Sequence, residues 1–143
     1  MPTTFPVAAD TTGPLETAPL RPGTVLTGAP HARSRSLGAS PDGLLSYGLW
    51  DCTAGAFRWT FYSDEIVHIL EGEVTVRVDP SGEPRVLRAG DVAYFARGLV
   101  TIWEIDRYVR KLAVYRSEPS GLRARARRMV KQGLGEIRSR LAR

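Results

Sequence analysis

The chain has 143 residues, of which 43% are hydrophobic, and this is enough for one domain with one sizeable core. Its single cysteine, Cys52, excludes a disulfide within the chain, and no run approaches the roughly 18 apolar residues that a membrane span needs. The first twenty residues contain neither Lys nor Arg, so no secretory signal is expected and a cytoplasmic location is predicted.

The formal net charge of +5 is unevenly distributed along the chain. Residues 1–115 hold eleven Lys and Arg against thirteen Asp and Glu, whereas residues 116–143 hold nine against two. The basic character therefore belongs to the C-terminal segment, and the charge does not identify the predicted core as a nucleic-acid-binding domain.

Residues 1–42 are predicted to form an N-terminal arm or linker. They contain seven prolines among Thr, Ala and Gly, and they lack the hydrophobic periodicity that stabilises a regular element. Val25 and Leu26 are apolar neighbours that could add a short strand to a sheet edge.

Residues 43–116 are predicted to form one all-β domain. Short runs rich in Val, Ile, Trp, Tyr and Phe are separated by Gly and Pro turn signals, as in antiparallel sheets, and no segment of helical period interrupts them. The predicted strands are Leu45–Cys52, Ala56–Tyr62, Glu65–Leu70, Glu73–Val78, Arg85–Arg88, Asp91–Phe95, Thr101–Ile105 and Val109–Tyr115.

Residues 117–143 are predicted to form a basic amphipathic helix. Large apolar residues recur on one helical face from Leu122 to Leu141, and most of the arginines lie away from that stripe. The stripe could pack against the barrel or a dimer partner, or residues 122–143 could contact an anionic membrane surface. Nucleic acid is a less favoured partner, because no aromatic residues are interleaved for base stacking.

Two segments resemble the motifs of the cupin superfamily. Residues 59–72 follow the first motif, His-x-His-x3-Glu-x6-Gly, with Glu65 and Gly72 present but Trp59 and Phe61 at the histidine positions. Residues 90–101 follow the second motif, Gly-x5-Pro-x-Gly-x2-His, with Ala96 at the proline and Thr101 at the histidine.

The run from Gly48 to Lys111 is similar to the ureidoglycine aminohydrolase type of cupin. This resemblance implies a jelly-roll barrel, also called a double-stranded β-helix, and a homodimer. The family enzyme binds manganese at the positions that correspond to Trp59, Phe61, Glu65 and Thr101. Indole, phenyl and threonine side chains are poor ligands for this ion, so no tightly bound metal or other cofactor is predicted.

The resemblance also implies where a binding pocket would lie. If the strand geometry of the family holds, the barrel mouth receives the side chains of Trp59, Phe61, Glu65, Thr101 and Trp103, with Tyr94 as a further candidate. Such an aromatic pocket with one acid suits a flat or cationic small molecule. Alternatively, the aromatic rings fill the barrel themselves, and Glu65 then needs Arg58, Arg97 or Lys111 as a partner.

Three functions are consistent with these patterns. The first is small-molecule binding in the barrel without a tightly bound metal. The second is an aminohydrolase or isomerase type of enzyme in which Glu65, with a pKa raised by apolar walls, acts as acid or base. The third is a dimeric interaction module whose basic tail recruits a partner.

Overall fold

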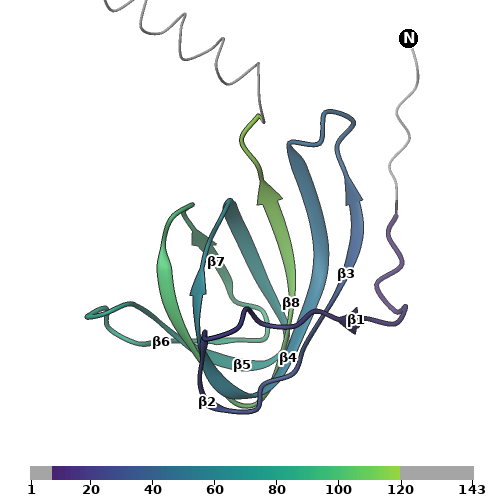
Figure 1. Cartoon of the computed structure of the whole chain (residues 1–143). Helices are drawn as coiled ribbons and strands as arrows, with labels where there is room; N and C mark the ends of the chain where they lie inside the picture. Colours follow the sequence, from purple (N-terminus) through teal and green to yellow (C-terminus); the bar gives the residue numbers. More distant parts are fainter. Residues whose placement is uncertain (1–7, 120–143) are drawn as a thin grey trace, which may run out of the picture.

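The structure of the chain, a computed structural model, describes residues 8–119. This part folds entirely into strands and loops, which confirms the all-β prediction (Figure 1). The strands are β1 (Glu16–Thr17), β2 (Val25–Gly28), β3 (Ala32–Ala39), β4 (Leu45–Thr60), β5 (Asp64–Val78), β6 (Arg85–Arg88), β7 (Val92–Phe95) and β8 (Val100–Arg116). Most of the predicted tail helix lies outside the described residues.

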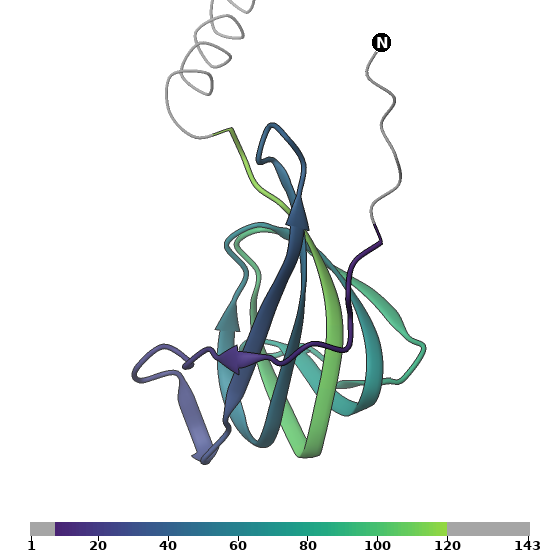
Figure 2. The same ribbon diagram turned by 90° about the vertical axis from the view of Figure 1, so that its right-hand side faces the viewer.

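The strands pair antiparallel in the order β1-β3-β4-β8-β5-β6, with β2 added to β4 and β7 added to β5. The sheet curls round on itself to form a barrel, with β8 between the long strands β4 and β5 (Figures 1 and 2). Among residues 8–119, no helix has the length and apolarity that crossing a membrane requires.

Three of the long strands each contain two of the predicted shorter ones. The predicted breaks fall at irregularities in pairing, between Thr53 and Gly55 in β4 and on both sides of Gly72 in β5. Gly72 has φ 74°, and a Cβ there would lie 2.0 Å from the carbonyl oxygen of Tyr108, so only glycine fits. The turn signals therefore mark bulges that bend continuous strands, and the predicted strand ends were wrong at these points.

The predicted N-terminal arm also differs from the structure. The short strand expected at Val25 and Leu26 is present as β2, but β1 and β3 lie in the same segment. β3 pairs with β4 from Ala32 opposite Cys52 to Ala39 opposite Ser46. Its composition of Arg, Ser, Gly and Ala gives little hydrophobic signal, because most of its side chains are only partly buried. Pairing with the apolar strand β4 decides its conformation.

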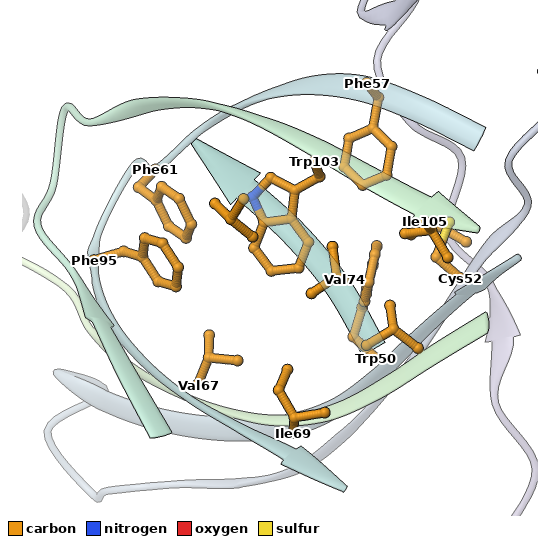
Figure 3. Packing of buried hydrophobic residues seen from close by; sticks show 13 residues of the cluster. Trp50, Cys52, Phe57, Phe61, Val67, Ile69, Val74, Phe95, Trp103 and Ile105 are labelled. Atoms are coloured by element: carbon orange, nitrogen blue, oxygen red, sulfur yellow. The ribbon is translucent and has the colours of Figure 1, made fainter. Parts of the chain in front are cut away.

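The core occupies the interior of the barrel. Figure 3 shows Val67 and Ile69 of β5 on the opposite side of the interior from Phe57 of β4, with Trp103 of β8 between them. Cys52 is fully buried among these side chains, and burial raises the pKa of its thiol to about 12. It therefore acts as a small apolar core residue.

Candidate ligand site at the barrel mouth

Aromatic rings fill the part of the barrel that the first motif reaches. The rings of Phe61 and Phe95 stack with centroids 4.4 Å apart and planes inclined by 5° (Figure 3). The ring of Phe57 stacks on that of Trp103, and Trp59 is half-buried beside Trp50 and Phe57. Each such contact adds about 0.5–1.5 kcal/mol beyond the buried area, so these rings form a rigid wall.

Thr101 is fully buried within this wall, and its hydroxyl both donates and accepts a hydrogen bond. The hydroxyl Oγ1 donates to the Trp59 carbonyl at 3.1 Å and accepts from Trp103 Nε1 at 3.0 Å. This arrangement follows from strand alternation, which directs Thr101 and Trp103 to the same side of β8. Both the indole N–H and the threonine hydroxyl are thereby satisfied away from water.

Glu65 forms a buried ion pair with Lys111, one of the three partners that the sequence allowed. Lys111 Nζ lies 2.7 Å from Glu65 Oε1, and each side chain is only 4% exposed. The ammonium also lies 5.0 Å from the ring centroid of Trp50 and 4.9 Å from that of Trp103. The two other candidates pair elsewhere, Arg58 with Asp79 and Arg97 with Glu118.

A cavity of about 520 Å³ opens at the barrel mouth beside the buried wall. Its charged lining residues are Arg77, Glu83 and Arg85, and Thr101 and Phe95 are its contacts with the aromatic wall. The register of β5 with its neighbours sets Val76 opposite Arg85 and Val78 opposite Thr101. The remaining lining residues are Val76, Val78, Gly82, Leu87, Val92, Ala93, Tyr94 and Phe95.

A sequence model of the EutQ-like cupin domain matches residues 39–113 of the chain, which is more than half of its length. The chain belongs to the EutQ-like cupin family. The predicted cupin jelly-roll barrel is thereby confirmed, while the finer likeness to ureidoglycine aminohydrolase stays a prediction. A comparison with curated proteins gave no match.

Solved structures share the fold of this EutQ-like domain. The ethanolamine utilization protein Q of Salmonella typhimurium LT2 is 30% identical, with a TM-score of 0.54 over 64% of this chain and 72% of that one. A DUF861-family protein of unknown function from Pseudomonas syringae is 25% identical, with a TM-score of 0.66 over 74% of this chain but 46% of its own length. EutQ of Clostridium difficile, at 19% identity and a TM-score of 0.55 over 69% and 80%, supports the fold alone.

The four positions at which the resembled aminohydrolase binds manganese do not fit a metal ion in this EutQ-like domain. Trp59 and Phe61 offer no lone pair, and the Thr101 hydroxyl is already engaged. Glu65 is paired with Lys111, whose ammonium repels a second cation. Within residues 8–119, no three His, Cys, Asp or Glu side chains gather in a way that could hold a metal.

Tyr94 lies on the outer face of the barrel, unlike the other predicted site residues. Its side chain is 62% exposed on the outer side of β7, and its hydroxyl donates to Asp64 Oδ1 at 3.1 Å. The next residue, Phe95, points into the barrel instead. Tyr94 also borders a smaller hollow of about 280 Å³ on the outer face, together with Leu45, Asp64, Glu65, Ile66, Val114 and Arg116. Tyr94, predicted as a candidate ligand-binding residue, faces outward on β7, and strand alternation directs Phe95 into the barrel instead.

Of the six predicted site residues, Thr101 alone lines the cavity from the interior. Trp59, Phe61, Glu65 and Trp103 gather in the wall behind it, and Tyr94 reaches only its outer border. The sequence interpretation missed Arg85, Leu87 and Phe95. Alternation along Val92–Phe95 could have identified Phe95, but the inward direction of Arg85 and Leu87 depends on how the short strand β6 pairs with β5.

Proposed function

We propose that this EutQ-like cupin domain binds a small organic molecule in the cavity at the barrel mouth and needs no tightly bound metal to do so. The observation that carries the proposal is the cavity itself. Its volume of about 520 Å³ lies within the roughly 300–1,000 Å³ of typical ligand sites, and apolar side chains predominate in its lining. The stacked rings behind it provide a preorganised wall, which lowers the entropy cost of binding.

The alternative of an enzyme that uses Glu65 as acid or base has weaker support. The Glu65 carboxylate is nearly inaccessible and forms an ion pair with Lys111 at 2.7 Å. A catalytic carboxylate must come within hydrogen-bond reach of a substrate, either directly or through one water. Glu65 is also absent from the lining of the barrel-mouth cavity, so its role is better explained as part of the wall.

The proposal is tested by filling the cavity. Val78 lines it and is 44% exposed, so Val78→Trp adds bulk without overpacking the core. Val86 is a matched control, because it is 40% exposed on the neighbouring strand and does not line the cavity. A panel of small acids, amines, alcohols, ureides and sugars is screened by thermal shift and calorimetry, with ethanolamine included because of the name of the Salmonella relative.

A ligand of the cavity raises the melting temperature of the wild type and of Val86→Trp, but has no effect on Val78→Trp. Equal binding by the two tryptophan variants would refute the site. Circular dichroism of both variants verifies that the added indole leaves the fold intact.

A further inference from the structure

Among residues 8–119, the side chains that line the deep part of the barrel-mouth cavity are apolar except for Thr101. Val76, Leu87, Ala93 and Phe95 are apolar, and they are buried or partly buried. Apart from Arg85 at the rim, the polar side-chain group among the inward-facing lining residues is the Thr101 hydroxyl, which already donates one hydrogen bond and accepts another within the wall. The part of a ligand that enters the barrel is therefore apolar, because an unpaired polar group there would be costly.

The charged lining residues, in contrast, form no ion pair within the part of the chain that the structure describes. Six arginines of the described part pair with carboxylates, which are Arg33, Arg35, Arg58, Arg88, Arg97 and Arg116. Within residues 8–119, Arg77 and Arg85 form no ion pair, although Arg77 donates one hydrogen bond to the Pro80 carbonyl. Glu83 is the one acid that lines the cavity, so the lining has a net positive charge.

Arg85 has the better position of the two arginines for contact with a ligand. It lies opposite Val76 across the β5–β6 pair and shares a strand face with Leu87, two residues further along β6. Val76 and Leu87 both line the cavity. Arg85 is exposed and forms no ion pair with residues 8–119. Its guanidinium can therefore pair with an incoming anion without breaking an existing ion pair.

We infer that the ligand is a small organic acid, whose carboxylate pairs with Arg85 and whose apolar part lies on Val76, Leu87 and Phe95. The planar guanidinium matches a carboxylate through two parallel hydrogen bonds, and the positive lining attracts anions. This inference rests on the proposed function, because it names the class of molecule that the same cavity binds.

Calorimetry at low ionic strength with hexanoate, 1-hexanol and hexylamine as probes tests the inference. The three share an apolar chain and differ in the head group. The wild type is expected to bind hexanoate at least about tenfold more tightly than 1-hexanol, and hexylamine most weakly. Butanoate is expected to bind more weakly than hexanoate, by about fourfold for each methylene that it lacks.

Arg85→Gln is expected to abolish the preference of hexanoate over 1-hexanol. Arg88→Gln is the matched control, because Arg88 lies on the same short strand, pairs with Glu73 and does not line the cavity. It should keep the preference.

The outcomes separate this inference from the proposed function. Equal binding of hexanoate and 1-hexanol would overturn the organic-acid class, and a preference that survives in Arg85→Gln would overturn the role of Arg85; in both cases the cavity remains a site. Failure of hexanoate to bind would overturn the same inference, and the wider panel then tests the cavity independently. Binding that is unchanged by Val78→Trp would overturn both.

Discussion

At the scale of single residues, the barrel interior contains a buried ion pair of Glu65 and Lys111. An isolated charge in a barrel interior would be strongly destabilising, but here the carboxylate is neutralised by the ammonium. The ammonium also lies over the faces of Trp50 and Trp103, which attract a cation. The first cupin motif thus retains its acid, and a lysine of the same chain provides the positive charge beside it.

Removal of one partner of this pair should be far worse than removal of both. Lys111→Met leaves the Glu65 carboxylate buried without a partner and is expected to lower the free energy of unfolding by about 3–5 kcal/mol. The double variant Glu65→Leu with Lys111→Met should regain most of that loss. Urea unfolding followed by tryptophan fluorescence measures both.

The exposed pair of Arg88 and Glu73 serves as the control for this experiment, since its loss in Arg88→Ala should cost less than about 1 kcal/mol. A Lys111→Met variant that is no less stable than Arg88→Ala would contradict the assigned role of the buried pair.

The sequence predicted only those features of the site that follow from the alternation of side chains along a strand. Alternation grouped Thr101 with Trp103, and the motif grouped both with Trp59, Phe61 and Glu65. The sequence could not select Lys111 among three cations, because that choice depends on which strands become neighbours. For the same reason Arg85 was missed: the direction of its side chain is fixed by pairing with β5 and not by local periodicity.

At the scale of elements, Asp51 connects three strands of the sheet. It lies on β4, where its carboxylate accepts from Arg33 Nε of β3 at 3.0 Å and from the Tyr108 hydroxyl of β8 at 2.7 Å. Burial raises the pKa of Asp51, but the hydrogen bonds from Arg33 and Tyr108 and the positive charges of Arg33 and Arg110 together outweigh it, and the pKa is lowered. Burial and the bond to Asp51 raise the pKa of Tyr108 to about 12.

Because the pKa of Asp51 is lower in the folded chain than in the unfolded chain, its ionised form stabilises the fold above the ordinary value of 3.8. This contribution is lost as the pH falls through the lowered pKa. Asp51→Asn is therefore expected to cost about 1–3 kcal/mol at pH 7, and progressively less below pH 4. Urea unfolding of both proteins between pH 7 and pH 2.5 measures the difference.

Tyr108→Phe should show a smaller loss with the same dependence on pH, because it removes one of the bonds to the carboxylate. A difference between wild type and Asp51→Asn that is the same at pH 7 and pH 2.5 would contradict the assignment.

The elements themselves were well predicted where apolar residues alternate and poorly predicted where pairing decides. β6 matches its prediction at both ends and β7 differs by one residue. Gly72 indicated a break, yet its positive φ and its contact with the Tyr108 carbonyl keep β5 continuous through a bulge. β3 was missed because its partly buried Arg and Ser side chains give no strand pattern, and its conformation depends on pairing with β4.

At the scale of the whole molecule, the outer face of the barrel presents an apolar surface around Ile66. Ile66 lies between Tyr94 of β7 and Val114 of β8, and Val92 extends the surface along β7. Ile66, Tyr94, Val92 and Leu45 are all exposed. A group of large apolar side chains of this kind on one face usually marks a contact surface.

We expect the C-terminal segment to contact this surface, because β8 ends beside it. β8 ends at Arg116, which borders the outer hollow together with Leu45, Ile66 and Tyr94. The sequence predicts an apolar stripe from Leu122 to Leu141 in the residues that follow. Burial of each large apolar side chain is worth about 1.5–3 kcal/mol. We therefore expect this stripe to cover the surface around Ile66.

Disulfide trapping in the full chain tests this arrangement. Cys52 is fully buried, so cysteines introduced in the pairs Ile66→Cys with Met129→Cys, and Tyr94→Cys with Val130→Cys, are the reactive thiols. We expect mild oxidation to give a disulfide within one chain, seen as a faster monomer band on a non-reducing gel.

The control pairs Met129→Cys with Glu104→Cys, at an exposed position on the other half of β8, and should give no disulfide. A disulfide-linked dimer would instead support the predicted homodimer. If neither product forms with either pair, the stripe does not cover this surface, and co-sedimentation with anionic vesicles then tests the predicted membrane contact of residues 122–143. The three outcomes thus distinguish what covers the apolar stripe: the barrel of the same chain, a second copy of the chain, or a membrane surface.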